Sequence, residues 1–78
     1  MSLKSFIEEF EEAVEDVDAG TLSGDTNYRQ LEQWDSLSVL TVIAMVDAEY
    51  GVRLKADDFK KSDTLAGLYE LVQGKANS

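Results

Sequence analysis

Residues 34–51 read WDSLSVLTVIAMVDAEYG, and this stretch contains both a start signal and a stop signal for one helix. Asp35 stands where a helix N-cap belongs, because its short acidic side chain can accept hydrogen bonds from the first free backbone N–H groups. Gly51 follows Tyr50 and suits the left-handed conformation that ends many helices. We therefore predict a helix that begins at Ser36 and ends at Tyr50.

The apolar residues of this helix cover most of its circumference. One stripe consists of Leu37, Leu40, Ala44 and Ala48, and another consists of Val39, Val42, Ile43 and Val46, with Met45 in addition. A helix of this kind is either central in the fold or keeps one face for a ligand or partner. The sequence leaves both interpretations open.

The segment before this helix predicts a first, amphipathic helix. Ser2 is the expected N-cap, and Asp18-Ala19-Gly20 is the expected stop. Its apolar residues recur at the spacing of one helix face, which comprises Leu3, Phe6, Ile7, Phe10, Ala13, Val14 and Val17. The connection that follows, up to Asp35, is rich in turn formers and is long for a compact domain. We expect it to pack back on the core through Leu22, Tyr28, Leu31 and Trp34.

The C-terminal part predicts one short helix and one longer helix. Residues 52–54 alternate in polarity but are too few for a sheet, so we interpret them as an extended loop. Residues 56–61 can form one or two helical turns, with Phe59 pointing inward. Asp63 can cap a last helix over residues 64–73, which is followed by a glycine and a frayed tail.

Together these elements predict an all-α fold, a small four-helix bundle of three main helices and one short helix, in a single domain over residues 1–78.

Sixteen acidic and seven basic residues give a net charge of −9. This charge disfavours nucleic-acid binding and favours a partner with a basic surface. The chain has neither an apolar run long enough for a membrane helix nor a signal-peptide pattern. We expect a cytoplasmic monomer without a membrane span.

The residue types that are missing restrict the chemistry. The sequence contains no cysteine and no histidine, so it lacks a thiol nucleophile, the commonest general base and the commonest zinc ligand. We therefore predict no catalytic residue and no metal ligand, which disfavours a self-sufficient enzyme. Asp16-Val17-Asp18-Ala19-Gly20 departs from a calcium loop at its glycine and at Asn27, and the adjacent Asp57-Asp58 would not face each other on a helix. We interpret both motifs as solvated acidic segments.

Asp35-Ser36-Leu37 can be explained as a capped helix start, but the chain as a whole resembles the acyl carrier protein family. This motif, preceded by Trp34, is similar to the family's Asp-Ser-Leu attachment motif. Glu49-Tyr50-Gly51-Val52-Arg53-Leu54 is similar to the family's Glu-x-Phe-Gly-Ile-x-Ile pattern, and Asp63-Thr64-Leu65 is similar to the turn before its last helix. The order of the motifs, the chain length and the acidity agree, so the resemblance covers nearly the whole chain.

The resemblance implies that Ser36 receives 4'-phosphopantetheine from coenzyme A through a separate phosphopantetheinyl transferase. Asp35 and Leu37 complete the attachment motif, and Asp35 helps to present the serine. The thiol of the arm then holds acyl groups as thioesters. The residues agree with this function, because the chain has no sulfur nucleophile of its own and no histidine that could activate Ser36. A phosphodiester on the first helical turn would also lie near the positive end of the helix dipole.

The resemblance further indicates a docking face and a cargo cleft. Many fatty-acid carriers have acidic residues soon after the serine, where this chain has Ser38 and Thr41. The expected docking residues are Val39, Leu40, Met45, Asp47 and Glu49. The residues in places where relatives line an acyl cleft are Tyr28, Ile43, Val46, Leu54, Phe59 and Leu65, which would equally serve as the core of a small bundle.

The function we predict is an acyl carrier that presents its cargo to acyl-loading and acyl-processing enzymes with basic docking patches. The neutral residues Ser38 and Thr41, in places where many fatty-acid carriers have acids, suggest a specialised fatty-acid, polyketide or related lipid pathway. One alternative is a peptidyl or aminoacyl carrier of the same fold. Another is an unmodified acidic helical adaptor, in which Ser36 would only belong to a capped turn.

Overall fold

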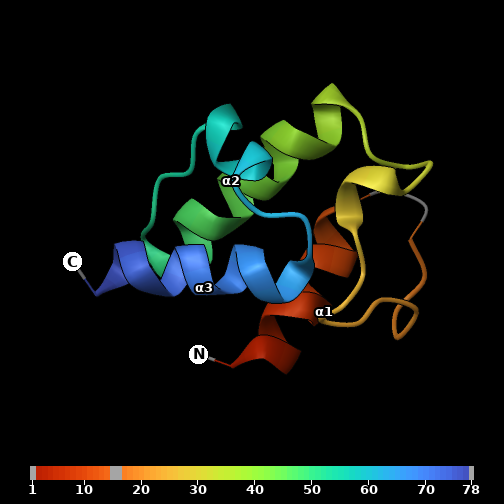
Figure 1. The fold of residues 1–78 in the computed structure, drawn as a ribbon, viewed down its shortest axis with the longest axis horizontal. Coiled ribbons are helices and arrows are strands. Elements are labelled where there is room, and N and C mark those ends of the chain that lie inside the picture. The colour runs from red at the N-terminus through yellow and green to blue at the C-terminus, as the bar shows by residue number, and fades with distance from the viewer. Residues whose placement is uncertain (1, 15–16, 78) are drawn as a thin grey trace.

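The computed structural model describes residues 2–14 and 17–77, and it confirms the all-α prediction (Figure 1). The elements in chain order are helix α1 (Leu3–Ala13), the 3-10 helix η1 (Tyr28–Gln30), helix α2 (Ser36–Tyr50), the 3-10 helix η2 (Ala56–Lys60) and helix α3 (Leu65–Ala76). Within the described residues, the only β-type pairing is an isolated antiparallel bridge between Asn27 and Thr64. No helix in the described ranges is long and apolar enough to cross a membrane.

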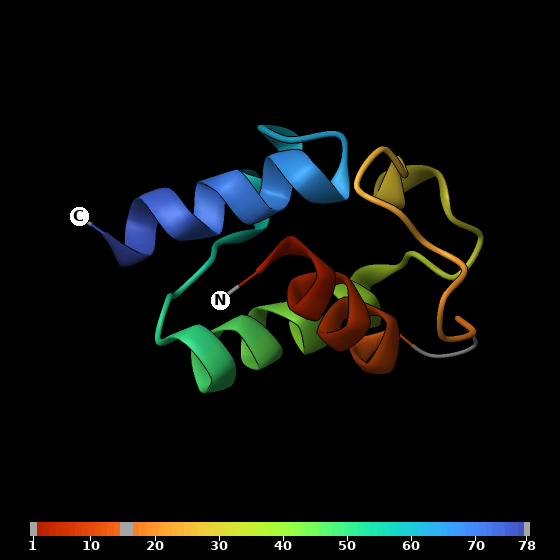
Figure 2. The ribbon, with the colours of Figure 1, turned by 90° about the horizontal axis from the view of Figure 1, so that it is seen from below.

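Helix α1 packs against both α2 and α3. In both views the long connection between α1 and α2 lies at the end of the molecule opposite the C-terminus (Figures 1 and 2). The three helices and the connection enclose one core, and its buried members are Phe6, Phe10, Val14, Tyr28, Val42, Val46, Val52, Leu54, Phe59, Leu65, Leu68, Tyr69 and Val72. Phe59 is therefore directed inward, as predicted.

Both predicted ends of α2 are confirmed. The Asp35 carboxylate accepts a hydrogen bond from the Ser38 backbone N–H at 2.8 Å, which satisfies one of the free donors at the helix start. At the other end Gly51 adopts φ 68°, and its N–H donates to the Asp47 carbonyl oxygen at 3.0 Å. A residue with a Cβ atom is strained at this φ, which explains the glycine.

Helix α1 is shorter than predicted. It ends at Ala13, because Val14 has extended backbone angles of φ −94° and ψ 122°. Val14 is nevertheless buried, and Val17 packs against the core outside any helix. The apolar spacing therefore identified residues that contact the core, but the predicted continuation of the helix to Val17 is wrong.

Helix α3 starts and ends later than predicted. Thr64 caps it rather than Asp63, since the Thr64 hydroxyl accepts a hydrogen bond from the Gly67 N–H at 3.1 Å. The helix continues through Gly74 to Ala76, so the predicted stop at this glycine and the frayed tail at residues 75–76 are wrong. A glycine inside a helix costs only about 1 kcal/mol relative to alanine, which is too little to end it here.

The long connection is anchored on the core as predicted. Tyr28 is fully buried, and Leu22, Leu31 and Trp34 are partly buried against the core. The ring centroids of Tyr28 and Trp34 lie 5.1 Å apart, and those of Phe10 and Trp34 lie 5.8 Å apart. Aromatic pairs at such separations add to the stabilisation that burial alone provides.

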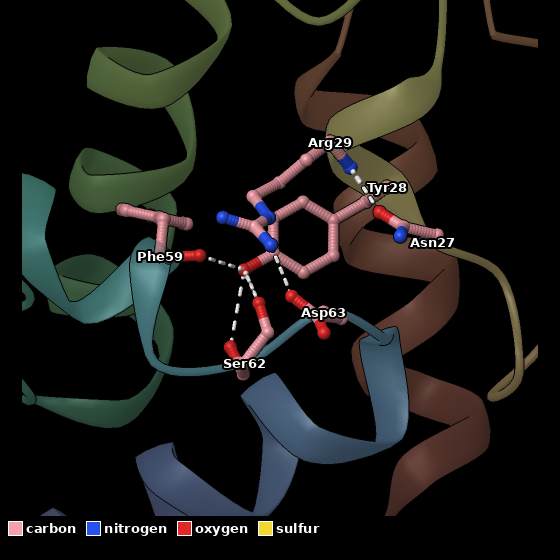
Figure 3. Close-up of polar contacts among 6 residues, drawn as sticks. All are labelled: Asn27, Tyr28, Arg29, Phe59, Ser62 and Asp63. Atoms are coloured by element: carbon pink, nitrogen blue, oxygen red, sulfur yellow. Dashed lines mark hydrogen bonds and ion pairs between the residues drawn. The ribbon is translucent and has the colours of Figure 1, made fainter.

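The Tyr28 hydroxyl joins the connection to the segment between η2 and α3. It lies 2.8 Å from the Ser62 carbonyl oxygen, 3.0 Å from the Phe59 carbonyl oxygen and 3.1 Å from the Ser62 hydroxyl (Figure 3). Its one proton can go to one carbonyl at a time, while the Ser62 hydroxyl can donate to the Tyr28 oxygen. Burial raises the pKa of Tyr28, so the hydroxyl keeps its proton at neutral pH. Beside it, Arg29 forms an ion pair with Asp63.

A buried carboxylate holds the first part of the same connection. The two Glu11 carboxylate oxygens accept hydrogen bonds from the Gly20 N–H at 3.1 Å and from the Leu22 N–H at 3.0 Å. These bonds satisfy a charge that would otherwise be costly to bury. Glu11 therefore fastens the connection to α1.

Candidate functional site at the start of helix α2

Ser36 is the first residue of α2, and its side chain is exposed. Within the described part of the chain, no hydrogen bond engages its hydroxyl group. Ser38, two residues later, is different: its side chain is buried, and its hydroxyl donates to the Gln33 carbonyl oxygen at 2.8 Å. Of the two serines in this turn, only Ser36 offers an accessible hydroxyl group.

The electrostatic setting of Ser36 combines a helix start with a carboxylate. The hydrogen bond from the Ser38 backbone N–H holds the pKa of Asp35 below its ordinary value, so this carboxylate is ionised at neutral pH. The first N–H groups of α2 and the helix dipole favour a negative group on the first turn. An exposed hydroxyl at this place fits the attachment of a phosphate ester. The chain contains no histidine, which is the commonest general base in proteins.

A cavity of about 410 Å³ lies beside this helix start. Asp35, Leu37 and Ser38 line one part of it, and Glu32 and Ala13 line other parts. Helix α1 and the connection therefore contribute to the surroundings of Ser36. The docking residues predicted from the sequence all belong to α2, whereas Ala13 of α1 and Glu32 of the connection also line this cavity.

The exposed face of α2 resolves the two interpretations that the sequence left open. Leu37 is 60% exposed and Leu40 is 64% exposed, and Ala44 and Ala48 on the same stripe are exposed as well. The other stripe faces the core, where Val42 and Val46 are fully buried. Helix α2 is thus central on one side and keeps an apolar face free on the other.

The five expected docking residues do not lie in equivalent surroundings. Leu40, Asp47 and Glu49 are exposed, which suits contact with a partner. Val39 and Met45 are partly buried and pack against the core. The six expected cleft residues lie together in the core: Tyr28, Val46, Leu54, Phe59 and Leu65 are buried there, and Ile43 packs against them. A cargo chain would have to part these side chains to enter.

One interpretation of the acidic motifs is wrong. Asp57 is exposed as expected, but Asp58 is buried, and its carboxylate accepts a hydrogen bond from the Lys55 N–H at 2.8 Å. The amino groups of Lys61 and Lys75 both lie 3.8 Å from its oxygens. These partners allow the charge to be buried, and they tie η2 to the end of α3. The first residue of the calcium-like motif, Asp16, lies outside the described residues.

Comparisons with known proteins agree with this site. Residues 6–72 match the family described as the phosphopantetheine attachment site. The polyketide-8 synthase acyl carrier protein 2 of Streptomyces avermitilis is 32% identical over 60 residues, which cover 77% of this chain and 69% of that protein. No solved structure gives a significant match. The chain therefore belongs to the phosphopantetheine-dependent acyl carrier family.

Members of this family are not themselves catalytic, and phosphopantetheine is their covalent prosthetic group. When bound, the group supplies the thiol that this chain lacks. What the structure shows in the chain itself is an exposed hydroxyl group at a capped helix start, next to an exposed apolar face of α2.

Proposed function

We propose that Ser36 is the attachment residue and that the protein tethers acyl intermediates as thioesters. The observation that supports this most directly is the place of Ser36, which is the exposed first residue of a capped helix within the matched residues 6–72. Leu37 and Asp35 flank it as the motif requires. Asp35 holds the first turn of α2 through the Ser38 N–H and thereby orients the serine.

The modification is a transfer of phosphopantetheine from coenzyme A. The Ser36 oxygen forms a bond to phosphorus, the bond from that phosphorus to the nucleotide part breaks, and adenosine bisphosphate leaves. The serine proton goes to a base of the phosphopantetheinyl transferase, since this chain has no histidine to accept it. The carrier then raises the effective concentration of its cargo at successive active sites.

The pathway we propose is a specialised one of the polyketide or related lipid type. Two observations support it: the relative from Streptomyces avermitilis is named as a polyketide synthase carrier, and Ser38 and Thr41 stand where many fatty-acid carriers have acids. A direct test compares this carrier with the fatty-acid carrier as substrates of the general elongation enzymes. We expect slower elongation on this chain, and equal rates would contradict a specialised pathway.

The docking face and the cleft remain part of the proposal. Leu40, Asp47 and Glu49 would contact partner enzymes, with Val39 and Met45 supporting the same surface from beneath. The cleft would form among the six core residues described above. Local opening of a small core requires less free energy than global unfolding, so entry of a cargo chain there is compatible with the fold.

The test of Ser36 is the intact mass after incubation with coenzyme A, magnesium and a broad-specificity phosphopantetheinyl transferase. We expect the parent to gain one arm and Ser36→Ala to gain none. Ser38→Ala is the matched control, because it removes the neighbouring hydroxyl group and should still gain one arm. A parent that stays unmodified with several transferases, while folded, would support the unmodified adaptor instead.

A further inference from the structure

We propose that the phosphopantetheinyl transferase docks in an acidic groove between α1 and α2, and that the acids of α1 and of the connection, not those of α2 alone, recognise it. This inference rests on the proposed attachment at Ser36 and extends the docking surface beyond α2. It places a positively charged segment of the enzyme, with an apolar side chain at its centre, in the groove.

The groove consists of two adjoining cavities of about 410 Å³ each. The first lies beside Asp35 at the start of α2, and the second runs on between α1 and the middle of α2 as far as Glu49. Ala13 and Thr41 line both cavities, so these two residues mark the place where the cavities meet. Asp35 and Leu37, the two neighbours of Ser36 in the chain, line the first cavity, so an enzyme that reaches Ser36 comes close to this part of the groove.

All the charged residues that line the groove, among those described, are acidic. Its acidic lining residues are Glu9, Glu12, Glu32, Asp35 and Glu49, and neither cavity has a lysine or arginine among its described lining residues. Five carboxylates around a concave surface concentrate a negative potential there. Leu37, Ala44 and Met45 also line the two cavities and add apolar surface between the acids. This combination fits cationic side chains at the rim and an apolar side chain between them.

One of the acids is held in position by the fold. Glu9 accepts a hydrogen bond from the Tyr50 hydroxyl at the end of α2. Burial raises the pKa of Tyr50, and the neighbouring Glu9 raises it further, so this hydroxyl keeps its proton and remains a donor at neutral pH. A carboxylate that is already oriented loses less conformational entropy when a cation binds.

The groove also accounts for the neutral residues of α2. Ser38 and Thr41 stand where many carriers have acids, and both line the groove instead of bearing a charge. The hydroxyl of Thr41 donates to the Leu37 carbonyl oxygen at 2.9 Å, and that of Ser38 is engaged as well. Small neutral side chains leave the groove open, while three of its five acids, Glu9, Glu12 and Glu32, come from α1 and the connection.

The test is the kcat/KM of arm transfer for two double variants with the same change in net charge. Glu12→Arg with Glu32→Arg reverses two exposed acids of the groove, whereas Glu8→Arg with Glu70→Arg reverses two exposed acids that line neither cavity. We expect the groove variant to lose about tenfold or more in kcat/KM, mainly through KM, and the control to stay within about twofold of the parent. The difference should narrow in ~1 M salt, where the screening length is about 3 Å.

Equal losses in the two double variants, or no loss in either, would overturn the groove as the docking site. Failure of the parent to gain an arm would instead contradict the proposed function, so the two failures can be told apart. Circular dichroism checks that both variants fold.

As a second measurement, labelled Ser36→Ala protein is titrated with the transferase and followed by NMR. We expect amide shifts at residues 9–13 and 41–45, and shifts confined to α2 would contradict the role of α1.

Discussion

The surroundings of Tyr28 and the surroundings of Ser36 differ sharply, although both lie in the same small domain. Tyr28 is fully buried, and its hydroxyl is surrounded by Phe59 and Ser62 (Figure 3). Ser36 is exposed and is followed by the exposed Leu37. The Tyr28 hydroxyl thus contacts residues more than 30 positions away in the chain, whereas the hydrogen bonds that Asp35 and Ser38 form at the start of α2 are local.

We therefore expect changes near Tyr28 to alter the stability of the fold, and changes at the start of α2 to alter the proposed binding of partner enzymes. Under the proposed function, the exposed side chains at the start of α2 would contact an enzyme, while Tyr28 belongs to the buried core.

The largest effect on stability is expected for Tyr28→Ala. It removes a fully buried ring and should lower the free energy of unfolding by about 3–5 kcal/mol, which is a large part of the stability of a small domain. Leu40→Ala, on the exposed face of α2, should stay within about 0.5 kcal/mol of the parent. Unfolding in urea, followed by circular dichroism, measures both.

Tyr28→Phe then isolates the hydroxyl group. It leaves the ring in place but deprives the Phe59 and Ser62 carbonyls of their donor, so we expect a loss of about 1–3 kcal/mol. If Leu40→Ala destabilised the protein as much as Tyr28→Phe does, the separation between the two regions would be wrong.

An intermediate effect is expected for Glu11→Gln. In the glutamine side chain one of the two acceptor oxygens is replaced by an NH₂ group, which is a donor and cannot accept from a backbone N–H. One of the Gly20 and Leu22 N–H groups then lacks its acceptor, so we expect the free energy of unfolding to fall by about 1–3 kcal/mol. Glu12→Gln on the same helix is the control, because Glu12 is exposed, and should be nearly neutral. Urea unfolding gives both values, and equal stabilities of the two variants would show that Glu11 does not hold the connection.

The smallest effect is expected for Asp35→Asn and depends on pH. The folded pKa of Asp35 is below its ordinary value, so its ionised form stabilises the fold above the unfolded pKa of about 3.9, and this contribution is lost as the pH falls through the folded pKa. Asparagine caps a helix but does not titrate. The parent should therefore melt slightly higher than Asp35→Asn at pH 7, and the difference should vanish in acid. A difference in melting temperature that does not change with pH would contradict the role of this charge.

The features that could be predicted from the sequence depend on local signals. Asp35 and Gly51 predict the two ends of α2 from the residues at each end alone, and the structure confirms both ends. The end of α1 could not be predicted in this way, because Val14 and Val17 continue the apolar spacing while they pack on the core outside a helix. Apolar spacing reports burial, and it distinguishes a helix from a buried extended segment only over longer stretches.

The features that could not be predicted depend on contacts between distant residues. The burial of Asp58 is possible because Lys75, at the end of α3, comes within 3.8 Å of it. The place of Glu9 and Glu12 beside Thr41 and Met45 requires the packing of α1 on α2. The motif that predicts Ser36 as the attachment residue is continuous in sequence, whereas the two adjoining cavities near it are lined by residues of three separate segments.

The way in which α3 begins has a consequence for how the chain folds. The Leu65 and Ala66 N–H groups donate to the Thr26 and Gly24 carbonyl oxygens at 3.2 and 2.9 Å, so the connection satisfies the first donors of this helix. A helix of 12 residues is marginal alone in water. Neither α3 nor the connection can therefore gain full stability before the other is in place. Because these contacts join residues about 40 positions apart, we expect α3 and the connection to become ordered together rather than one after the other.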